Sequence, residues 1–150
     1  MTVGLLLDAD EQVAAYLFKN HVSPVMSYDK AIGLVDSGSL VGGILLQSWN
    51  GANIELSYYG RGTLSAGIIR CLARILLSTF NPARVTVTTG RKRKRLVKAL
   101  QKLGFVLEGT QRCFYGQLDC ARNTGVRFVM FRGRLEILAR LKFAEERQHA

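Results

Sequence analysis

The sequence predicts a single α/β domain built on a mixed β-sheet. Residues 31–59 hold three apolar, β-prone runs separated by turn signals, which is typical of an antiparallel meander. From residue 64 onward, apolar residues at helical spacing alternate with short strand-like runs. A length of 150 residues is the usual size of one domain, and no internal repeat or linker divides the sequence. We therefore expect one domain over residues 1–150.

The first half of the chain is expected to form a helix followed by three strands. Residues 8–20 carry apolar positions at helical spacing, and Asp8 or Asp10 can cap their N-terminus. Asn50-Gly51 is a strong hairpin signal because both residues tolerate positive φ. The strands of the predicted meander are residues 31–35, 40–49 and 52–59.

The second half is expected to alternate helices with strands. An apolar face over residues 64–80 predicts a helix that begins at Thr63 or Leu64 and ends before Pro82. A second apolar helical stripe is followed by Gly104, the expected left-handed residue after a helix. The remaining predicted elements are a strand at 84–88, strand-like runs at 105–107 and 111–115 that form a pair or one bent strand, a last strand at 125–131 and a terminal helix at 134–147.

Charge and cysteine usage limit the partners and the setting. The formal net charge is +10 and the pI is about 10.0, so the surface attracts anions such as nucleic acid, acidic proteins or a polyphosphate cofactor. No apolar stretch approaches the roughly 18 residues of a membrane helix, and the N-terminal apolar run lacks the basic region of a signal peptide. The three cysteines have the spacing of neither a zinc site nor a disulfide framework. We expect a reduced, cytoplasmic setting, no membrane contact and no metal.

Four further side chains carry no chemistry in this interpretation. Cys71 lies within the apolar helix and is expected in the core. Trp49 is expected to pack at the end of its strand. Cys113 and Cys120 have no histidine nearby in the sequence to activate them, so neither is expected to act as a nucleophile.

A glycine-bearing turn between a predicted strand and a predicted helix is a candidate phosphate site. The N-terminus of a helix offers unpaired backbone N–H groups that suit a pyrophosphate. Glycines let the backbone approach the phosphates closely, and an arginine adds a charge-assisted contact. An ordinary β-to-α turn that needs two glycines is the alternative. The residues of this turn are Gly60, Arg61, Gly62, Thr63, Leu64 and Ser65.

Two motifs make the sequence resemble a known family. Leu103-Gly104-Phe105 is followed by Glu108-Gly109 and Arg112, and Ile54-Glu55-Leu56-Ser57 leads into the glycine-bearing turn. In this combination the chain resembles the GNAT superfamily of N-acetyltransferases, and in particular small GNAT-like proteins often carried by bacteriophages and proteobacteria. The resemblance extends over about residues 31–115. It implies a GNAT-like fold, which is a twisted mixed sheet splayed at its middle with helices on both faces.

The resemblance also implies a reaction and a site. The reaction is transfer of an acetyl group from acetyl-CoA to a primary amine, in the cytoplasm or, for a phage protein, in the host cytoplasm or the virion. Leu56, Ser57 and Tyr58 would hold the pantetheine through their backbone, and residues 60–65 would hold the pyrophosphate. Glu55 is the candidate general base, with a solvent-facing or salt-bridged strand residue as the alternative.

Two departures from the family pattern support a second hypothesis. Arg93 stands where the family often has an asparagine, and Leu100 stands where it often has a tyrosine that acts as general acid. By residue type alone, Tyr58, Tyr59 and Tyr115 are possible acids. The alternative function is therefore a catalytically degenerate GNAT-like module, either a phage structural protein or a nucleic-acid-binding protein.

Five consecutive cations stand at the start of a predicted helix: Arg91, Lys92, Arg93, Lys94 and Arg95. A helix N-terminus is already partly positive, so this placement disfavours the helix and hints at an anionic partner. The 3′-phosphate of CoA, to which Arg93 would contribute, and nucleic-acid phosphate are rival partners. A solvated basic turn is the third possibility. Lys98 and Lys102 extend the run along one helix face.

Overall fold

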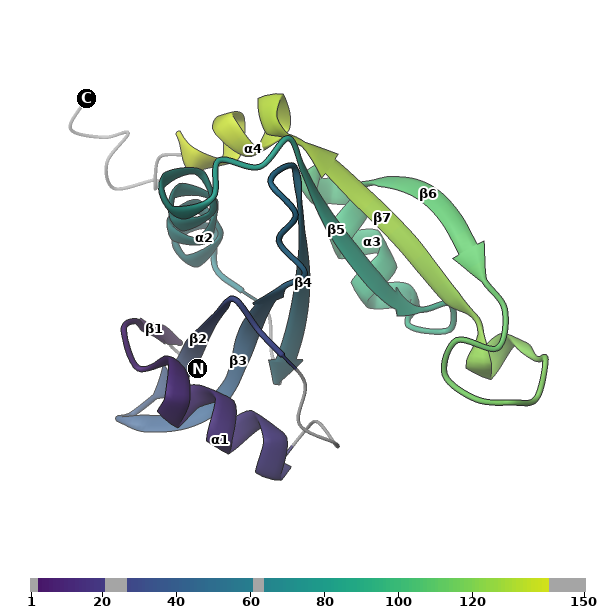
Figure 1. Cartoon of the computed structure of the whole chain (residues 1–150), viewed down its shortest axis with the longest axis horizontal. Coiled ribbons are helices and arrows are strands. Elements are labelled where there is room, and N and C mark those ends of the chain that lie inside the picture. The colour runs from purple at the N-terminus through teal and green to yellow at the C-terminus, as the bar shows by residue number, and fades with distance from the viewer. Residues whose placement is uncertain (1–2, 21–26, 61–63, 141–150) are drawn as a thin grey trace.

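The computed structural model describes residues 3–20, 27–60 and 64–140. These residues form an open sheet with the strand order β1-β2-β3-β4-β5-β7-β6, flanked by helices (Figure 1). The strands are β1 (Gly4–Leu6), β2 (Lys30–Asp36), β3 (Ser39–Gln47), β4 (Asn53–Gly60), β5 (Arg84–Gly90), β6 (Val106–Gln111) and β7 (Gly125–Phe131). The helices are α1 (Asp10–Asn20), α2 (Ala66–Thr79), α3 (Lys94–Leu103) and α4 (Arg132–Ala139), with a short 3-10 turn at Ala121–Asn123.

The predicted mixed sheet and its antiparallel meander are confirmed. β2 pairs with β3 and β3 with β4, in both cases antiparallel, while β4 and β5 pair in parallel. β1 was not predicted from the sequence; its three residues pair with β2. A run of three residues is too short to show the alternation by which a strand is recognised in a sequence.

Helices cover both faces of the sheet, as the resemblance implied. On one face α1 packs Val13, Ala14 and Leu17 onto Ala31 of β2 and Leu45 of β3. On the other face α2, α3 and α4 share a second apolar core with the inward side chains of β4, β5 and β7. The largest fully buried side chain, Phe128 of β7, lies in this second core at 1% exposure.

The sheet is splayed between its two central strands. β4 and β5 pair only at Asn53↔Arg84, Ile54↔Val85 and Glu55↔Thr86. Beyond these positions β4 stays paired with β3 as far as Gly60, and β5 stays paired with β7 as far as Gly90. The two strands therefore diverge while each keeps its outer neighbour (Figure 1). We call the opening between residues 56–60 of β4 and residues 87–90 of β5 the fork.

Several predicted helix boundaries are wrong, and local geometry explains those of α1 and α2. α1 begins at Asp10 because Asp8 has a left-handed backbone with φ 58°. α2 begins at Ala66, later than predicted, because Ser65 is its N-cap. α4 begins at Arg132, directly after β7, and ends at Ala139. Residues 141–147 of the predicted terminal helix lie outside the described residues.

Two predicted strands also differ in extent. The strand predicted to reach Trp49 ends at Gln47, because Ser48 takes a left-handed backbone with φ 57° and starts a longer turn. Asn50 organises that turn, because its side-chain oxygen accepts hydrogen bonds from the N–H groups of Ala52 and Asn53 at 2.9 and 2.7 Å. β6 is one strand at residues 106–111, and a strand at 111–115 is wrong because residues 112–124 form turns with φ 55° at Cys113.

The prediction for Trp49 is confirmed and that for Cys71 is wrong. The ring of Trp49 packs against Phe80 with centroids 5.3 Å apart. Cys71 is exposed, because the buried face of α2 is formed by Ile68, Leu72 and Leu76 and Cys71 points away from it.

Gly104 ends α3 as predicted, and its replacement by alanine is expected to be costly. Its φ is 106°, and a Cβ there would lie 2.4–2.8 Å from the side chain of Arg134. Arg134 in turn donates to the carbonyl of Leu103 at 2.8 Å. We expect Gly104→Ala to lower the free energy of unfolding by about 1–3 kcal/mol in chemical denaturation. The control is Gly109→Ala, which meets no atom within 4 Å and should change stability by less than about 0.5 kcal/mol; equal effects would contradict this account of Gly104.

Candidate functional site

The fork exposes backbone hydrogen-bonding groups of two strands. In a sheet, each strand uses alternate N–H and C=O groups for its two neighbours. Residues 56–60 of β4 have β3 on one side but have lost β5 on the other, and residues 87–90 of β5 have likewise lost β4. A ligand that carries amides can pair with such an edge in the way an added strand does. The backbone of Leu56, Ser57 and Tyr58 is therefore a strand edge of this kind, paired with β3 and not with β5.

The described ends of the predicted phosphate turn lie between β4 and α2. Gly60 closes β4 with φ 145°, a backbone that L side chains rarely adopt. Ser65 accepts a hydrogen bond from the N–H of Ile68 at 3.3 Å and so caps α2. By helix geometry the N–H groups of Ala66 and Gly67 point out of the helix end and remain suited to an anion. Leu64 packs against the core, and Arg61, Gly62 and Thr63 lie outside the described residues.

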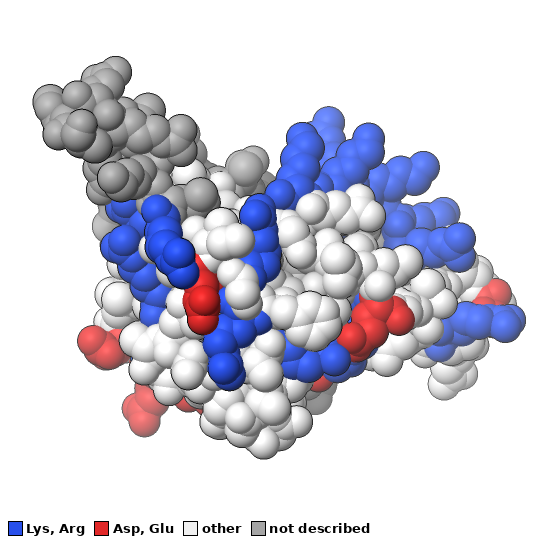
Figure 2. All heavy atoms as spheres, turned by 90° about the horizontal axis from the view of Figure 1, so that it is seen from above, with Lys and Arg blue, Asp and Glu red and all other residues white. Residues whose placement is uncertain are grey.

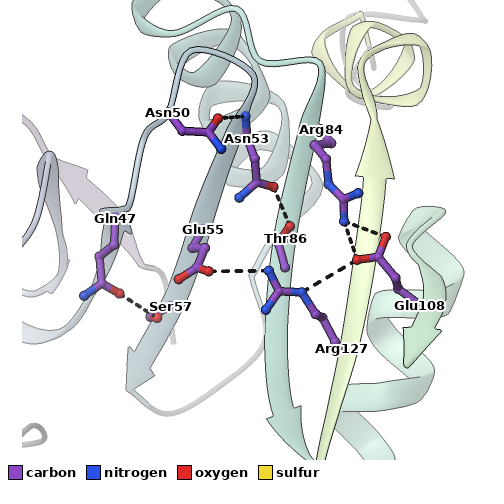
Figure 3. Close-up of polar contacts among 9 residues, drawn as sticks. All are labelled: Gln47, Asn50, Asn53, Glu55, Ser57, Arg84, Thr86, Glu108 and Arg127. Carbon is purple, nitrogen blue, oxygen red and sulfur yellow. Dashed lines mark hydrogen bonds and ion pairs between the residues drawn. The ribbon is translucent and has the colours of Figure 1, made fainter. Parts of the chain in front are cut away.

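Glu55 stands where the fork begins and belongs to an ion-pair ladder (Figure 3). Its carboxylate accepts from Arg127 Nη2 of β7 at 3.5 Å. The Nε of Arg127 lies 3.7 Å from the carboxylate of Glu108 on β6. Both oxygens of that carboxylate accept hydrogen bonds from Nη2 of Arg84 on β5, each at 2.5 Å. The Glu55 side chain is still 40% exposed, so a substrate amine or water can approach it. Glu55 is thus salt-bridged and accessible at the same time.

Two polar pairs, each with one buried member, fix the strands around Glu55. Thr86, at 1% exposure, donates its hydroxyl to Asn53 Oδ1 at 2.5 Å, which fastens β5 to β4 just before they part. Ser57 donates to Gln47 Oε1 at 3.0 Å and fastens β4 to β3 (Figure 3). Both pairs lie on the sheet face that carries the ladder. A buried polar side chain that is hydrogen-bonded adds specificity to the register of its strand.

Arg93 lies at the open end of the fork. It packs over Gly90 of β5 together with the ring of Tyr115. Burial raises the pKa values of Tyr58 on β4 and of Tyr115, and in both cases the Arg93 guanidinium partly opposes the shift. Both phenols are therefore protonated at neutral pH. A cation close enough to affect both phenols at this end of the fork suits a phosphate or another anion.

The position where the family often has its catalytic tyrosine cannot supply an acid. Leu100 points into the core between α3 and the sheet and is 7% exposed. Of the tyrosines named from the sequence, Tyr58 lies on β4 within the fork and Tyr115 lies in the turns after β6. Tyr59 points to the opposite sheet face, toward α1.

Four residues around Glu55 were not predicted from the sequence: Arg127, Arg84, Asn53 and Thr86. Arg127 lies 72 positions from Glu55, and only the antiparallel pairing of β5 with β7 brings it near β4. A single arginine within an apolar strand was the one available signal. Thr86 has no such signal, because threonine is common in strands.

The described residues contain neither a metal cluster nor a spanning helix. No group of three His, Cys, Asp or Glu side chains within residues 3–20, 27–60 and 64–140 could hold a metal ion. In the same ranges no helix is long and apolar enough to cross a membrane.

Comparison with known proteins places this architecture in one class. No family model matches the sequence, and no curated protein does. A variant of the spermidine N-acetyltransferase SpeG from Vibrio cholerae matches the structure with a TM-score of 0.69 at 13% identity, over 89% of this chain and 96% of that chain. A GCN5-related N-acetyltransferase from Brucella melitensis matches with a TM-score of 0.58 at 17% identity, over 75% of this chain and 55% of that one.

The chain therefore has the fold of the GNAT N-acetyltransferases. The resemblance drawn from the sequence motifs is confirmed at the level of the fold.

Proposed function

We propose that this protein is an acetyl-CoA-dependent N-acetyltransferase that acts on a primary amine. The observation that carries the proposal is the fork: two parallel strands part beside the N-terminus of a helix, and a glutamate stands at their last paired position. The fold alone does not fix an activity, so the proposal depends on these residues. The likeness to SpeG and to the Brucella enzyme supports the same class of reaction.

The residues present fit acetyl-CoA. The backbone of residues 56–58 offers an edge for the amides of the pantetheine arm, and the N–H groups of Ala66 and Gly67 suit the pyrophosphate. Arg93 adds a cation at the open end of the fork. On β5, the hydroxyl of Thr89 is buried at 3% exposure and has no hydrogen-bond partner among the described residues. An orphaned buried hydroxyl in the diverging part of the strand is accounted for by a polar ligand there.

Acetyl-CoA would supply the activated acyl group. In the transfer, the amine nitrogen would form a bond to the acetyl carbon as the C–S bond of the thioester breaks. The amine would lose a proton and the leaving thiolate would gain one. Glu55 accepts the proton of the amine, directly or through a water, since its carboxylate is accessible from the ladder face of the sheet. Arg127 holds that carboxylate in place.

The proton that the leaving thiolate needs has two candidate donors on this chain. Tyr58 and Tyr115 keep their protons at neutral pH because burial raises their pKa values. Tyr58 is the better placed, because it lies on β4 within the fork, whereas Tyr115 lies in the turns after β6. This assignment replaces the family's tyrosine, whose position is taken by the buried Leu100.

A cytoplasmic setting belongs to this proposal. Cys71, Cys113 and Cys120 are all free thiols, which fits a reducing compartment.

The proposal is tested by binding and turnover on the same preparation. Calorimetry with CoA is expected to give a Kd in the micromolar range or below. Thiol release from acetyl-CoA should then depend on an added amine, and a panel of amines that includes spermidine, amino sugars and lysine peptides defines the acceptor. No heat at millimolar CoA would contradict the proposal.

A second function, a non-catalytic GNAT-like module, is favoured by one observation: α3 offers the buried Leu100 in place of an acid. The same experiment separates the two functions. CoA binding without amine-dependent thiol release across the panel supports the module, and turnover excludes it.

A further inference from the structure

The outer face of α3 is a continuous basic surface. At about 100° per residue, Leu96, Leu100 and Leu103 define the side of the helix that faces the core. Four cations, Lys94, Arg95, Lys98 and Lys102, project from the opposite side, and all four are exposed. We call these four residues the α3 stripe. Figure 2 shows the result from above, as blue side chains gathered without red ones at the upper right.

The cations of the α3 stripe make no ion pair or side-chain hydrogen bond among the described residues, unlike most arginines elsewhere in the structure. Arg84, Arg112, Arg127 and Arg140 are paired with carboxylates. Arg74, Arg132 and Arg134 donate to backbone carbonyls and fasten α4 to its surroundings. Within the described ranges, no member of the α3 stripe makes an ion pair or a side-chain hydrogen bond, and α3 contains no acidic residue.

The start of α3 is unfavourable for an isolated protein. Arg93 is the N-cap residue, yet its side chain makes no capping hydrogen bond. Lys94 and Arg95 then place two positive charges on the first turn, where the helix end is itself partly positive. Each such charge therefore disfavours the helix. A bound polyanion offsets this cost, whereas no carboxylate among the described residues pairs with Lys94 or Arg95.

The shape and chemistry of the α3 stripe favour a nucleic-acid duplex among polyanions. From Lys94 to Lys102 the helix rises about 12 Å, which corresponds to roughly three or four phosphates of one DNA strand at about 3.4 Å each. A membrane site would interleave large apolar side chains for insertion, and the exposed ones of this chain lie elsewhere. A single-strand site would offer aromatic rings for base stacking, and α3 contains none.

We infer that the α3 stripe binds the phosphate backbone of duplex nucleic acid without reading its sequence. Arg93 does not belong to this surface, because it turns toward the fork and packs on Gly90. The basic run therefore contributes to two anion sites. Arg93 contributes to the site in the fork, and the α3 stripe binds nucleic-acid phosphate on the outer surface. This inference is independent of the proposed acetyl transfer, since the two surfaces use different residues.

The test is a charge-removal variant in the full chain, with binding measured to a short duplex DNA of arbitrary sequence at several salt concentrations. For four phosphate contacts, the log–log dependence of affinity on salt is expected to have a slope of about −3.6. The variant Lys94→Gln/Arg95→Gln/Lys98→Gln/Lys102→Gln should bind at least tenfold more weakly at low salt, with a slope shallower by about 3–4. Its CoA affinity should stay within about twofold of the original.

A control with the same change in net charge removes four exposed cations outside α3, of which Arg112 and Arg140 are ion-paired: Lys19→Gln/Arg112→Gln/Arg122→Gln/Arg140→Gln. It lowers the net charge equally and should lose less than about threefold in duplex affinity. Equal losses in both variants would overturn the inference, because net charge alone would then explain binding. Absence of duplex binding at low salt, tighter binding to phosphatidylserine vesicles or to a single strand, or loss of CoA binding alone in the α3 variant would each overturn it too.

Discussion

Replacing Glu55 by glutamine is expected to lower kcat by about 10²- to 10³-fold with the best amine of the panel. The amide keeps the size of the side chain and can still contact Arg127, but it cannot take a proton from the amine. The affinity for CoA should stay within about twofold, because the proposed cofactor contacts come from other residues of the fork. The measurement is steady-state thiol release together with calorimetry.

The control for this prediction is Glu108→Gln, which removes the other carboxylate that faces Arg127. Glu108 lies on β6, which is separated from β5 by β7 and lies on the side of β5 away from β4. Its loss should lower kcat by less than about fivefold. A Glu55→Gln variant with unchanged kcat would show that Glu55 only anchors Arg127.

Truncating Phe128 to alanine is expected to have the largest effect on stability. Its ring fills the core between β7 and the helices at 1% exposure. Loss of a buried phenylalanine costs about 3–5 kcal/mol, against a total stability of about 5–15 kcal/mol for a domain. In a domain of this size, the midpoint of thermal unfolding should fall by about 6–20 °C.

Phe131 provides the matched control on the same strand. It is 56% exposed, so Phe131→Ala should change the free energy of unfolding by less than about 0.5 kcal/mol. Calorimetric unfolding of both variants measures the difference. Similar losses would mean that the second core does not hold the sheet in the way the structure indicates.

Much of the fold is predictable from the sequence because its signals are local. β7 was predicted with its observed bounds, since Gly125 starts an apolar run that ends where the chain turns into α4. The end of α3 was predicted because Gly104 follows a helical stripe and only glycine readily adopts its φ of 106°. β4 was found within a residue or two from Asn50-Gly51 and the run that follows.

The site itself is only partly predictable. The sequence motifs indicated Glu55 and the turn before α2, but not that Glu55 meets Arg127. That contact depends on the strand order β4-β5-β7, in which the last strand inserts between β5 and β6. No local pattern specifies such an order, because it depends on the long-range packing of the whole sheet.

The basic run shows the same limit in another form. From the sequence, its cations formed one group with two rival partners. The structure separates them, since Arg93 precedes the helix and packs on Gly90, while Lys94 and Arg95 already follow the helical path. A change of direction at a single N-cap residue is a matter of backbone dihedrals, which composition does not reveal.

The most direct test of the central claim, that the fork binds CoA, is an NMR titration of the ¹⁵N-labelled full chain with CoA. We predict that the amide signals of residues 56–60, of Ala66 and Gly67 and of Thr89 shift with a single saturating curve. Signals of β1 and β2, which lie at the edge of the sheet and are separated from the fork by β3, should not shift. An absence of shifts at millimolar CoA, or shifts confined to the α3 stripe, would contradict the claim.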